Sequence, residues 1–187
     1  MIEKWIEEKD NLDIILDIGC GVGESTYHLG QEFKDALVIG IDKSLDRLNR
    51  NNEFKQKLPA NILLVRGDII DLWSLFLKNS DKYNILKQYI LYPNPYPKQK
   101  HLSLRWQGHA IFPTIMQLGS PIEVRSNWKL YLEEFLAAAS EFGVQSSDGV
   151  QVYKPTIVQT PFERKYLESS QILYRLCLLY TSPSPRD

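Results

Sequence analysis

The sequence has few cysteines, no metal-binding pattern and no long apolar run. Only two of its 187 residues are cysteines, too few for the disulfide framework of a small secreted domain. The His, Cys and acidic residues show no ligand spacing, so we expect no metal. No apolar stretch approaches the ~20 residues that cross a bilayer, which predicts no membrane span. The start, MIEKWIEEKD, lacks the apolar core of a secretory signal, and the predicted compartment is the cytoplasm.

An excess of either charge is also missing. The chain has 22 Lys and Arg against 23 Asp and Glu, a net charge of −1 that neither indicates nor excludes nucleic acid. Hydrophobic residues make up 43% and charged residues 24%, as in an ordinary globular protein. A chain of this length and composition can bury a sizeable core.

The last residues differ in character from the rest. Residues 177–187 read CLLYTSPSPRD, which resembles a translated sequencing-library adapter. We therefore predict a single domain over residues 1–176, followed by a non-native tail over residues 177–187.

Short apolar runs alternate with helical segments in the first half of the chain. The runs typical of buried parallel strands are 13–18, 37–41, 61–65 and 88–92. The segments expected to be helical are 23–33, 46–58 and 69–77. This alternation predicts a parallel sheet with helices on both faces, connected by right-handed crossovers.

The second half is less regular. Residues 93–113 contain four of the ten prolines and little periodicity. The elements expected after Pro93 are helices 112–118 and 128–142 and strands 122–125, 150–153 and 171–176. Together with the first half they give an α/β, Rossmann-like fold with a mostly parallel seven-stranded sheet.

A glycine loop follows the first strand. The strand ends near Asp17 and continues into Gly19-Cys20-Gly21-Val22-Gly23. Glycines here let the backbone approach a ligand, and the next helix adds free N–H groups and positive potential. The dinucleotide fingerprint G-x-G-x-x-G places its last glycine one residue later. The tighter spacing favours an S-adenosyl-L-methionine loop and a class I methyltransferase; a nicotinamide oxidoreductase fits it poorly.

Acidic residues stand at the ends of the first three strands, where ligands bind in such sheets. We expect Asp17 to meet the methionine end of the cofactor and Asp42 to accept both ribose hydroxyls. Asp68 and the adjoining Ile69 are assigned to the adenine end. Two of these acids have an ordinary alternative: Asp42 could be a solvated strand-end acid or a helix cap, and Asp68 an N-cap.

Three later segments carry a family resemblance. Residues 92–109, YPNPYPKQKHLSLRWQGH, look like the F-P-D-P-W-x-K-x-R-H segment of the bacterial tRNA (guanine-N7)-methyltransferases. Residues 125–128, RSNW, are similar to that family's x-T-D-W, and residues 160–164, TPFER, to its T-x-F-E. With the glycine loop, the resemblance runs in order from about residue 13 to residue 176.

The resemblance implies a set of site residues and a partner. The cofactor positions that it implies are Asp17, Asp42, Asp68 and Asn94. The substrate positions that it implies are Lys98, Asn127, Thr160 and Glu163, with Asn94 and Asn127 at the family's catalytic positions. His101 and Arg105 lie in a basic stretch that would face RNA. The implied partner is tRNA, and we expect a monomer or a weak homodimer.

The chain departs from the family's sequence motifs at three positions. Asn94 and Asn127 replace aspartates, and Tyr96 replaces a tryptophan. Guanine N7 needs no general base, and an Asn can donate to guanine O6, so loss of activity does not follow. Two alternatives stay open: a non-catalytic RNA-binding module, and an enzyme that methylates an amino group, because Asn-Pro-Tyr-Pro is close to an Asn-Pro-Pro-aromatic motif.

Ordinary structural roles compete with several of these assignments. Glu163 could accept from the Watson–Crick edge of guanine, but Thr160 to Glu163 also form a capping box with Pro161 at the first helical position. Asn94 between two prolines is a common turn residue. Asn127 could cap the helix that follows it.

A basic stretch spans the proline-rich region. From Lys82 to Ile122 there are five Lys or Arg, two His and no acid, which suits phosphate binding. Tyr92, Tyr96 and Trp106 add aromatic rings on which a base could stack. The alternative is a solvated loop with Trp106 in the core.

Overall fold

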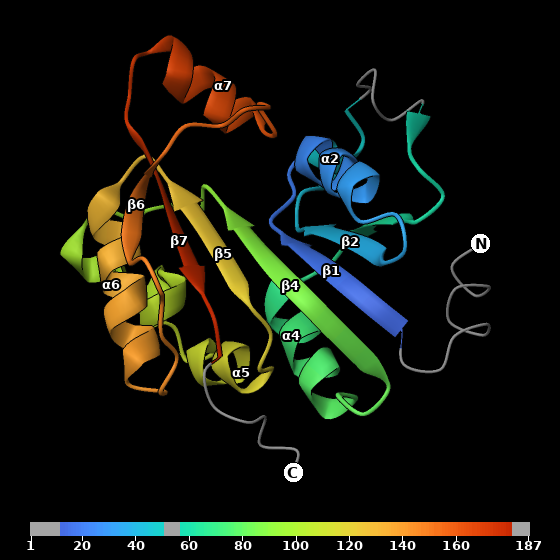
Figure 1. The fold of residues 1–187 in the computed structure, drawn as a ribbon, viewed down its shortest axis with the longest axis horizontal. Coiled ribbons are helices and arrows are strands. Elements are labelled where there is room, and N and C mark those ends of the chain that lie inside the picture. The colour runs from blue at the N-terminus through green and yellow to red at the C-terminus, as the bar shows by residue number, and fades with distance from the viewer. Residues whose placement is uncertain (1–11, 51–56, 181–187) are drawn as a thin grey trace. The chain divides into compact units, whose positions relative to one another are not determined.

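A computed structural model describes residues 12–50 and 57–180 of the chain. Seven strands form one sheet in the order β3-β2-β1-β4-β5-β7-β6 (Figure 1), which confirms the predicted seven-stranded, mostly parallel sheet. The strands are β1 (Leu12–Ile18), β2 (Leu37–Asp42), β3 (Ile62–Arg66), β4 (Tyr83–Leu91), β5 (Ile122–Ser126), β6 (Val150–Tyr153) and β7 (Leu173–Leu178). The helices are α2 (Glu24–Glu32), α3 (Leu45–Leu48), α4 (Ile69–Lys78), α5 (Phe112–Gln117), α6 (Lys129–Ser140) and α7 (Pro161–Glu168), with 3₁₀ turns η2 (Gln99–Leu104) and η3 (Trp106–Gly108).

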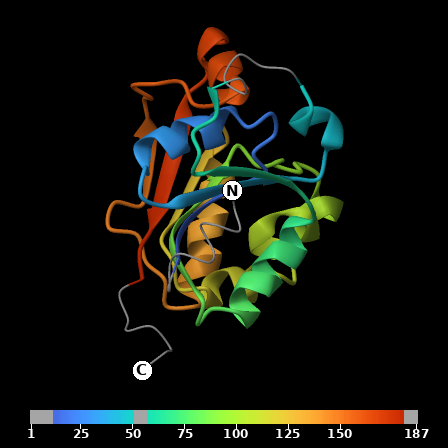
Figure 2. The same ribbon diagram turned by 90° about the vertical axis from the view of Figure 1, so that its right-hand side faces the viewer.

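The chain divides into two compact units, Met1–Tyr89 and Ile90–Asp187. In unit 1, β1 pairs with β2 and β2 with β3, both in parallel. Every residue of β2 is buried, which requires cover on both faces of the strand. Figure 2 shows α2 and α4 on opposite sides of the unit 1 strands. The expected strands and crossover helices of the first half are thus present.

The Asn61 side chain caps carbonyl groups at the C-terminal end of α2. The amide nitrogen of Asn61, which is 5% exposed, donates to the carbonyl oxygens of Gly30, Phe33 and Ala36 at 3.2, 2.9 and 3.0 Å. These carbonyls belong to the helix end and the turn after it, where intrahelical partners are missing. Asn61 therefore fixes the connection between α2 and β2 from the entry to β3.

Unit 2 contains the antiparallel part of the sheet. β7 pairs with β5 on one side and with β6 on the other, and α6 packs on all three strands. Tyr131, Leu132, Phe135 and Ala139 form the buried face of α6, as the sequence predicts. Phe142, expected on the same face, is 46% exposed after the end of the helix.

Several element boundaries differ from the predictions. The predicted helix 46–58 is α3, which ends at Leu48; residues 51–56 of that prediction lie outside the described residues. β4 begins at Tyr83, five residues before the predicted start at Gln88, and η2 and η3 were not predicted. Helix α7 begins at Pro161, as its capping box predicts.

The end of β7 crosses the predicted start of the tail. Cys177 pairs with Glu123 and Leu178 with Ile122, so the strand continues two residues past 176. Strand pairing does not test the origin of these residues, and the single domain over 1–176 with a non-native tail stays a prediction. Within the described parts of the chain, no helix is long and apolar enough to cross a membrane, and no three His, Cys, Asp or Glu gather as metal ligands.

Candidate functional site

The glycine loop is hydrogen-bonded to the end of β2. The N–H groups of Gly19 and Cys20 donate to the Ile41 carbonyl at 2.9 and 3.0 Å, and that of Gly21 donates to Asp42 Oδ2 at 2.9 Å. Gly19 and Gly21 have φ of +74° and +61°. A Cβ built on either would meet no heavy atom of the described residues within 4 Å. The backbone of this loop therefore faces open space, which fits the close approach of a ligand.

Gly23, the third glycine assigned to the cofactor, has a packing role. It precedes α2 with a φ of +86°, and a Cβ there would lie 3.0 Å from Leu64 Cδ1. Its missing side chain lets the start of α2 approach β3. Contact between Gly23 and a cofactor stays a prediction.

Asp17 anchors the first turn of α2 from within the core. Its side chain is 1% exposed, and Oδ2 accepts hydrogen bonds from Ser25 Oγ and Thr26 Oγ1, both at 2.6 Å. The acid thereby joins the C-terminal end of β1 to the helix that follows the glycine loop. Its predicted contact with the methionine end remains untested.

Asp42 organises the edge of the site in unit 1. It is 1% exposed, and Oδ1 accepts from the Ser44 N–H at 2.8 Å and forms an ion pair with Arg47 at 3.0 Å. Oδ2 holds Gly21. Oδ1 thus has two partners, whereas Oδ2 keeps one lone pair, and the predicted role toward the ribose hydroxyls stays a prediction.

Asp68 is the N-cap of α4, the ordinary alternative to its predicted role. Its Oδ1 accepts from the Ile70 N–H at 2.9 Å, and Oδ2 pairs with Lys43 at 3.0 Å. The carboxylate is 38% exposed, so capping does not preclude contact with a ligand. Ile69 is buried.

Cys20 lies inside the glycine loop and is 7% exposed. Burial raises the pKa of its thiol, and the charges of Asp17 and Asp42 raise it further. The thiol is therefore protonated at neutral pH, and it is not an activated nucleophile.

In unit 2, Asn94 occupies an exposed turn. Its Oδ1 accepts the Tyr96 N–H at 3.2 Å, which is the turn-forming interaction expected of an Asn between prolines. The carbonyl oxygen accepts one bond within the turn and keeps a second lone pair, while the Nδ2 group is a donor. The exposed side chain can therefore both donate and accept.

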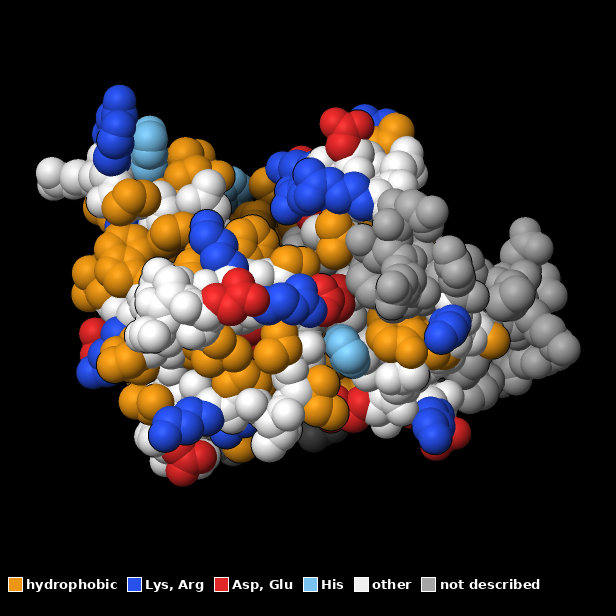
Figure 3. All heavy atoms as spheres, turned by 90° about the horizontal axis from the view of Figure 1, so that it is seen from above, with side chains coloured by type: hydrophobic (Ala, Val, Ile, Leu, Met, Phe, Trp, Pro, Cys, Tyr) orange, Lys and Arg blue, Asp and Glu red, His pale blue; other side chains and the backbone are white. Residues whose placement is uncertain are grey.

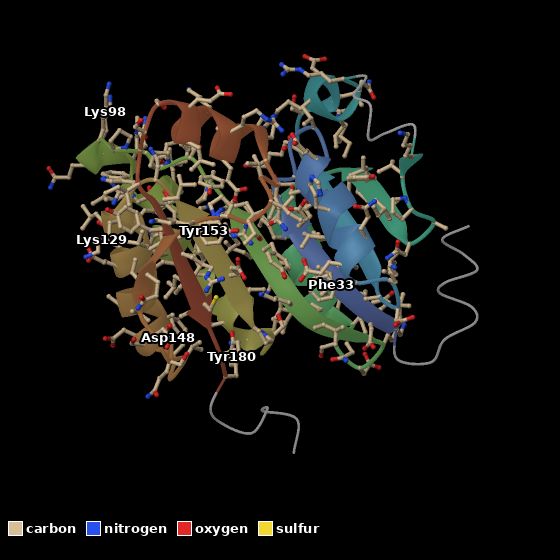
Figure 4. All side chains as sticks on the ribbon, turned by 45° about the horizontal axis from the view of Figure 1, so that its top comes forward. Phe33, Lys98, Lys129, Asp148, Tyr153 and Tyr180 are labelled. Atoms are coloured by element: carbon tan, nitrogen blue, oxygen red, sulfur yellow. The ribbon has the colours of Figure 1, made fainter. Side chains whose placement is uncertain are left out.

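Lys98 and His101 lie where the basic stretch meets solvent. Lys98 is exposed and extends outward (Figure 4). The His101 ring contacts the Tyr96 ring edge-on, with centroids 6.1 Å apart. Figure 3 shows Lys, Arg and His side chains among hydrophobic ones on the face seen there. These two assignments are compatible with RNA contact and stay predictions.

Arg105 does not face RNA in this structure, contrary to expectation. It is 4% exposed. Its Nε donates to the carbonyls of Pro95 and Tyr96 at 3.0 and 3.3 Å, and its guanidinium forms an ion pair with Glu134. It also lies over the Trp128 ring, 5.0 Å from the centroid. The sequence gives no sign of this, because the partners come from separate segments.

Asn127 does not cap α6. Its Nδ2 donates to Gln171 Oε1 at 2.7 Å, while the N-cap residue is Trp128, whose N–H donates to Ser126 Oγ at 3.0 Å. The amide joins the end of β5 to the segment after α7. Its predicted catalytic and substrate roles are untested.

Thr160 caps α7 as the sequence predicts. Its hydroxyl accepts the Glu163 N–H at 3.0 Å, and Glu163 Oε2 accepts the Gln159 N–H at 2.7 Å, one residue before the usual target. Glu163 is 0% exposed. Its Oε1 accepts from the Tyr92 hydroxyl at 3.1 Å and from Arg125 Nη1 at 2.9 Å. Both oxygens serve the protein, so the predicted contact with a guanine edge is not available in this arrangement.

Arg125 is the residue that sequence reasoning missed. It lies in β5 and is 5% exposed, with Nε donating to Glu123 at 2.7 Å and its guanidinium over the Tyr153 ring at 4.4 Å. Burial alone lowers the Arg125 pKa, but the neighbouring Glu123, Tyr153 and Glu163 outweigh it and raise the pKa. Burial and the Glu163 charge also raise the Tyr92 pKa. An arginine two residues after a glutamate, inside the short predicted strand 122–125, was the available signal.

Solved structures that superpose on most of this chain identify the fold. An antibiotic-related methyltransferase aligns over 94% of this chain and 91% of its own, at 18% identity and a TM-score of 0.67. A 16S rRNA (adenine(1408)-N(1))-methyltransferase from Catenulisporales acidiphilia aligns over 99% and 92%, at 18% identity and a TM-score of 0.63. The fold is that of the class I methyltransferases.

The family follows from the sequence comparison. A family model described as "Putative methyltransferase" matches residues 11–176, and the chain belongs to this methyltransferase family. It is 28% identical over 175 residues to a tRNA (guanine-N(7)-)-methyltransferase of Chlorobium phaeobacteroides, covering 89% of this chain and 81% of that protein. It is 33% identical over 106 residues to the enzyme so named in Clostridium botulinum, covering 52% and 47%. The chain spans about half the length of that relative, and 49% of a Thermotoga maritima one at 28% identity.

Proposed function

We propose that this chain methylates N7 of a guanine in tRNA, with S-adenosyl-L-methionine as the methyl donor. The observation that carries the proposal is the glycine loop, whose Gly19 and Gly21 backbone faces open space beside Asp42. The names of the Chlorobium and Clostridium relatives support the choice of tRNA and of guanine N7. We further propose that the protein acts in the cytoplasm as a monomer or weak homodimer.

The residues of unit 1 suit the cofactor. S-adenosyl-L-methionine, when bound, supplies an electrophilic methyl group on a sulfonium. The loop backbone at Gly19 and Gly21 can approach the amino-acid end of such a ligand, and Oδ2 of the buried Asp42 keeps one lone pair for a ribose hydroxyl. Exposed Asp68 is assigned to the adenine amino group. These residues bind and orient, and positioning supplies most of the catalysis that such a transfer requires.

The residues of unit 2 are compatible with a guanine target. Guanine N7 has a lone pair and no proton, so the protein needs no general base for it. Asn94 uses its carbonyl oxygen on the Tyr96 N–H and keeps its amide group as a donor, which matches guanine O6. Oδ1 keeps a second lone pair, so the turn does not itself exclude an amino-group target, and product analysis separates the two. Exposed Lys98 supports the choice of tRNA, because its charge can neutralise a phosphate.

The test combines cofactor binding with product analysis. The purified chain is titrated with S-adenosyl-L-methionine by calorimetry, then incubated with unmodified tRNA and labelled cofactor, and the nucleosides are identified by mass spectrometry. We expect binding and N7-methylguanosine. Cofactor binding with an N2- or N6-methylated product would identify a different methyltransferase. Binding of tRNA without any cofactor binding would identify an RNA-binding module.

A further inference from the structure

Two tyrosines in unit 2 flank Pro93-Asn94-Pro95 in a strained backbone conformation. Tyr92 has a φ of +52° and Tyr96 a φ of +43°. This left-handed region is disfavoured for residues with bulky side chains and costs about 1 kcal/mol or more at each position. We call residues 92–96 the proline corner. Strain of this kind persists only where neighbouring groups impose it, and it gathers at functional sites.

Tyr92 is held by Glu163, by the strand beside it and by one ring. Its N–H donates to the Arg125 carbonyl at 2.8 Å. Its hydroxyl donates to Glu163 Oε1 at 3.1 Å, and its ring lies 5.7 Å from that of Tyr166. Glu163 is fixed in turn by the buried ion pair with Arg125. The first strained residue is thereby clamped at both its backbone and its side chain.

Tyr96 is held by Arg105. The Tyr96 carbonyl accepts from Nε at 3.3 Å and from Nη2 at 3.1 Å, and the Pro95 carbonyl accepts from Nε at 3.0 Å. The Tyr96 N–H is held by Asn94. A planar guanidinium fixed by Glu134 and by the Trp128 ring thus determines where these two carbonyls lie.

We propose that Glu163 and Arg105 are positioning residues, which hold the two tyrosines left-handed and so fix the direction of the Asn94 side chain. Glu163, Arg105 and Asn94 differ in exposure, and this difference indicates which of them can touch a substrate. Glu163 and Arg105 are 0% and 4% exposed, whereas Asn94 is exposed. The two charged residues act on a substrate through the proline corner rather than by touching it. The inference rests on the proposed function only in giving Asn94 a substrate to bind.

The first test compares two carboxylates on the same arginine. Glu163→Gln weakens the clamp on Tyr92 directly, whereas Glu123→Gln changes the second buried carboxylate that pairs with the Arg125 guanidinium. We measure hydrogen exchange of the Tyr92, Asn94 and Tyr96 amides, corrected for the melting temperature of each variant. We expect about tenfold faster exchange in Glu163→Gln only. Equal exchange in the two variants would overturn the proposal.

The second test measures whether Glu163 acts through the Tyr92 hydroxyl. Tyr92→Phe removes only that hydroxyl. If the clamp is the route, Tyr92→Phe and Glu163→Gln each lower kcat for tRNA methylation about tenfold with little change in KM, and the double variant is no worse than either single one. Additive losses, or a loss confined to KM for tRNA, would mean that Glu163 contacts the substrate directly.

The third test uses rescue at the other end of the proline corner. Arg105→Lys keeps the charge and loses the forked donors, so exchange at Tyr96 rises and kcat falls. Adding Tyr96→Asn should restore much of both, because Asn adopts the left-handed conformation at lower cost. Failure of Tyr96→Asn to restore either would contradict the role given to Arg105.

The outcomes separate this proposal from the proposed function. If the unaltered chain forms no N7-methylguanosine, the proposed function fails, and exchange and its rescue alone decide whether Glu163 and Arg105 hold the proline corner. If exchange changes as expected while kcat is unaltered in every variant, the positioning role is wrong and the proposed function stands.

Discussion

Asp42 accepts the backbone N–H of Gly21 at 2.9 Å, so the acid at the end of β2 holds the loop that follows β1. The same carboxylate accepts the Ser44 N–H at 2.8 Å. One side chain therefore sets the backbone on both sides of the predicted ribose position. The loop conformation and the acid belong to one unit that a cofactor would meet already formed.

Asp42→Ala should lower both cofactor affinity and stability. It removes the acceptor of two backbone N–H groups, which costs about 1–3 kcal/mol. We expect S-adenosyl-L-methionine to bind at least about tenfold more weakly by calorimetry, a loss of about 1.4 kcal/mol. Asp46→Ala, in the exposed first turn of α3, is the control and should alter neither quantity. Unchanged affinity in Asp42→Ala would remove Asp42 from the cofactor site.

Alanine at Gly21 and at Gly23 should separate binding from packing. Both positions have a positive φ, which costs about 1 kcal/mol with any side chain. At Gly21 the added Cβ meets open space, whereas at Gly23 it lies 3.0 Å from Leu64. We expect Gly23→Ala to lower the melting temperature more, and Gly21→Ala to weaken cofactor binding more. The reverse order in paired thermal and calorimetric measurements would refute this division.

Asn61→Ala should destabilise the chain without touching the site. The change leaves three carbonyl groups near the end of α2 without their shared donor, at a cost of about 1–3 kcal/mol. Urea unfolding should show the loss, while cofactor affinity at a temperature where the variant is folded stays within about twofold. Asn79→Ala is a suitable control, because its amide bonds a single exposed helix carbonyl.

The sequence predicted the elements whose signal is local. The apolar run of β2, the capping box from Thr160 to Glu163 and the buried face of α6 each depend on residues a few positions apart, and the structure contains all three. The acids at the strand ends were found for the same reason. Their predicted ligand contacts remain to be measured.

What the sequence did not predict depends on distant partners. Glu163 pairs with Arg125, 38 positions away in the sequence, and Arg105 pairs with Glu134, 29 positions away. The burial of Glu163 and of Arg105 could therefore not be inferred from spacing. The left-handed conformation of Tyr92 and Tyr96 has no local signature either, because tyrosine disfavours it. Packing imposes it, and only the fold shows which side chains do so.

Cys20 should make stability sensitive to alkaline pH. Burial and the nearby Asp17 and Asp42 raise its pKa above the ordinary value of 9.0. The folded state keeps the thiol proton at a pH where the unfolded state loses it. The contribution of Cys20 to the free energy of unfolding is therefore full below pH 9 and declines as pH rises toward the folded pKa. Ionisation of this thiol in the unfolded state should lower the free energy of unfolding by about 1 kcal/mol between pH 8 and pH 10.

The comparison with Cys20→Ala isolates this contribution. Buried tyrosines such as Tyr131 also have a raised pKa. Their contribution to the pH dependence is the same in the unaltered chain and in Cys20→Ala, so it cancels in the difference. The unfolding free energy from urea titrations should fall less steeply with pH in Cys20→Ala. Parallel pH profiles for the two proteins would show that the Cys20 thiol titrates normally.

Burial of Arg105 limits how many counterions the basic stretch can displace from RNA. Each cation that neutralises a phosphate contributes about 0.7–0.9 to the slope of log affinity against log salt. Lys98 and Lys100 are exposed and should each contribute, whereas the Arg105 charge is already paired with Glu134. Lys98→Ala should therefore flatten the salt dependence of tRNA binding, and Arg105→Lys should leave its slope unchanged. The proposed binding of tRNA should thus depend less on salt than the number of basic residues in the sequence implies.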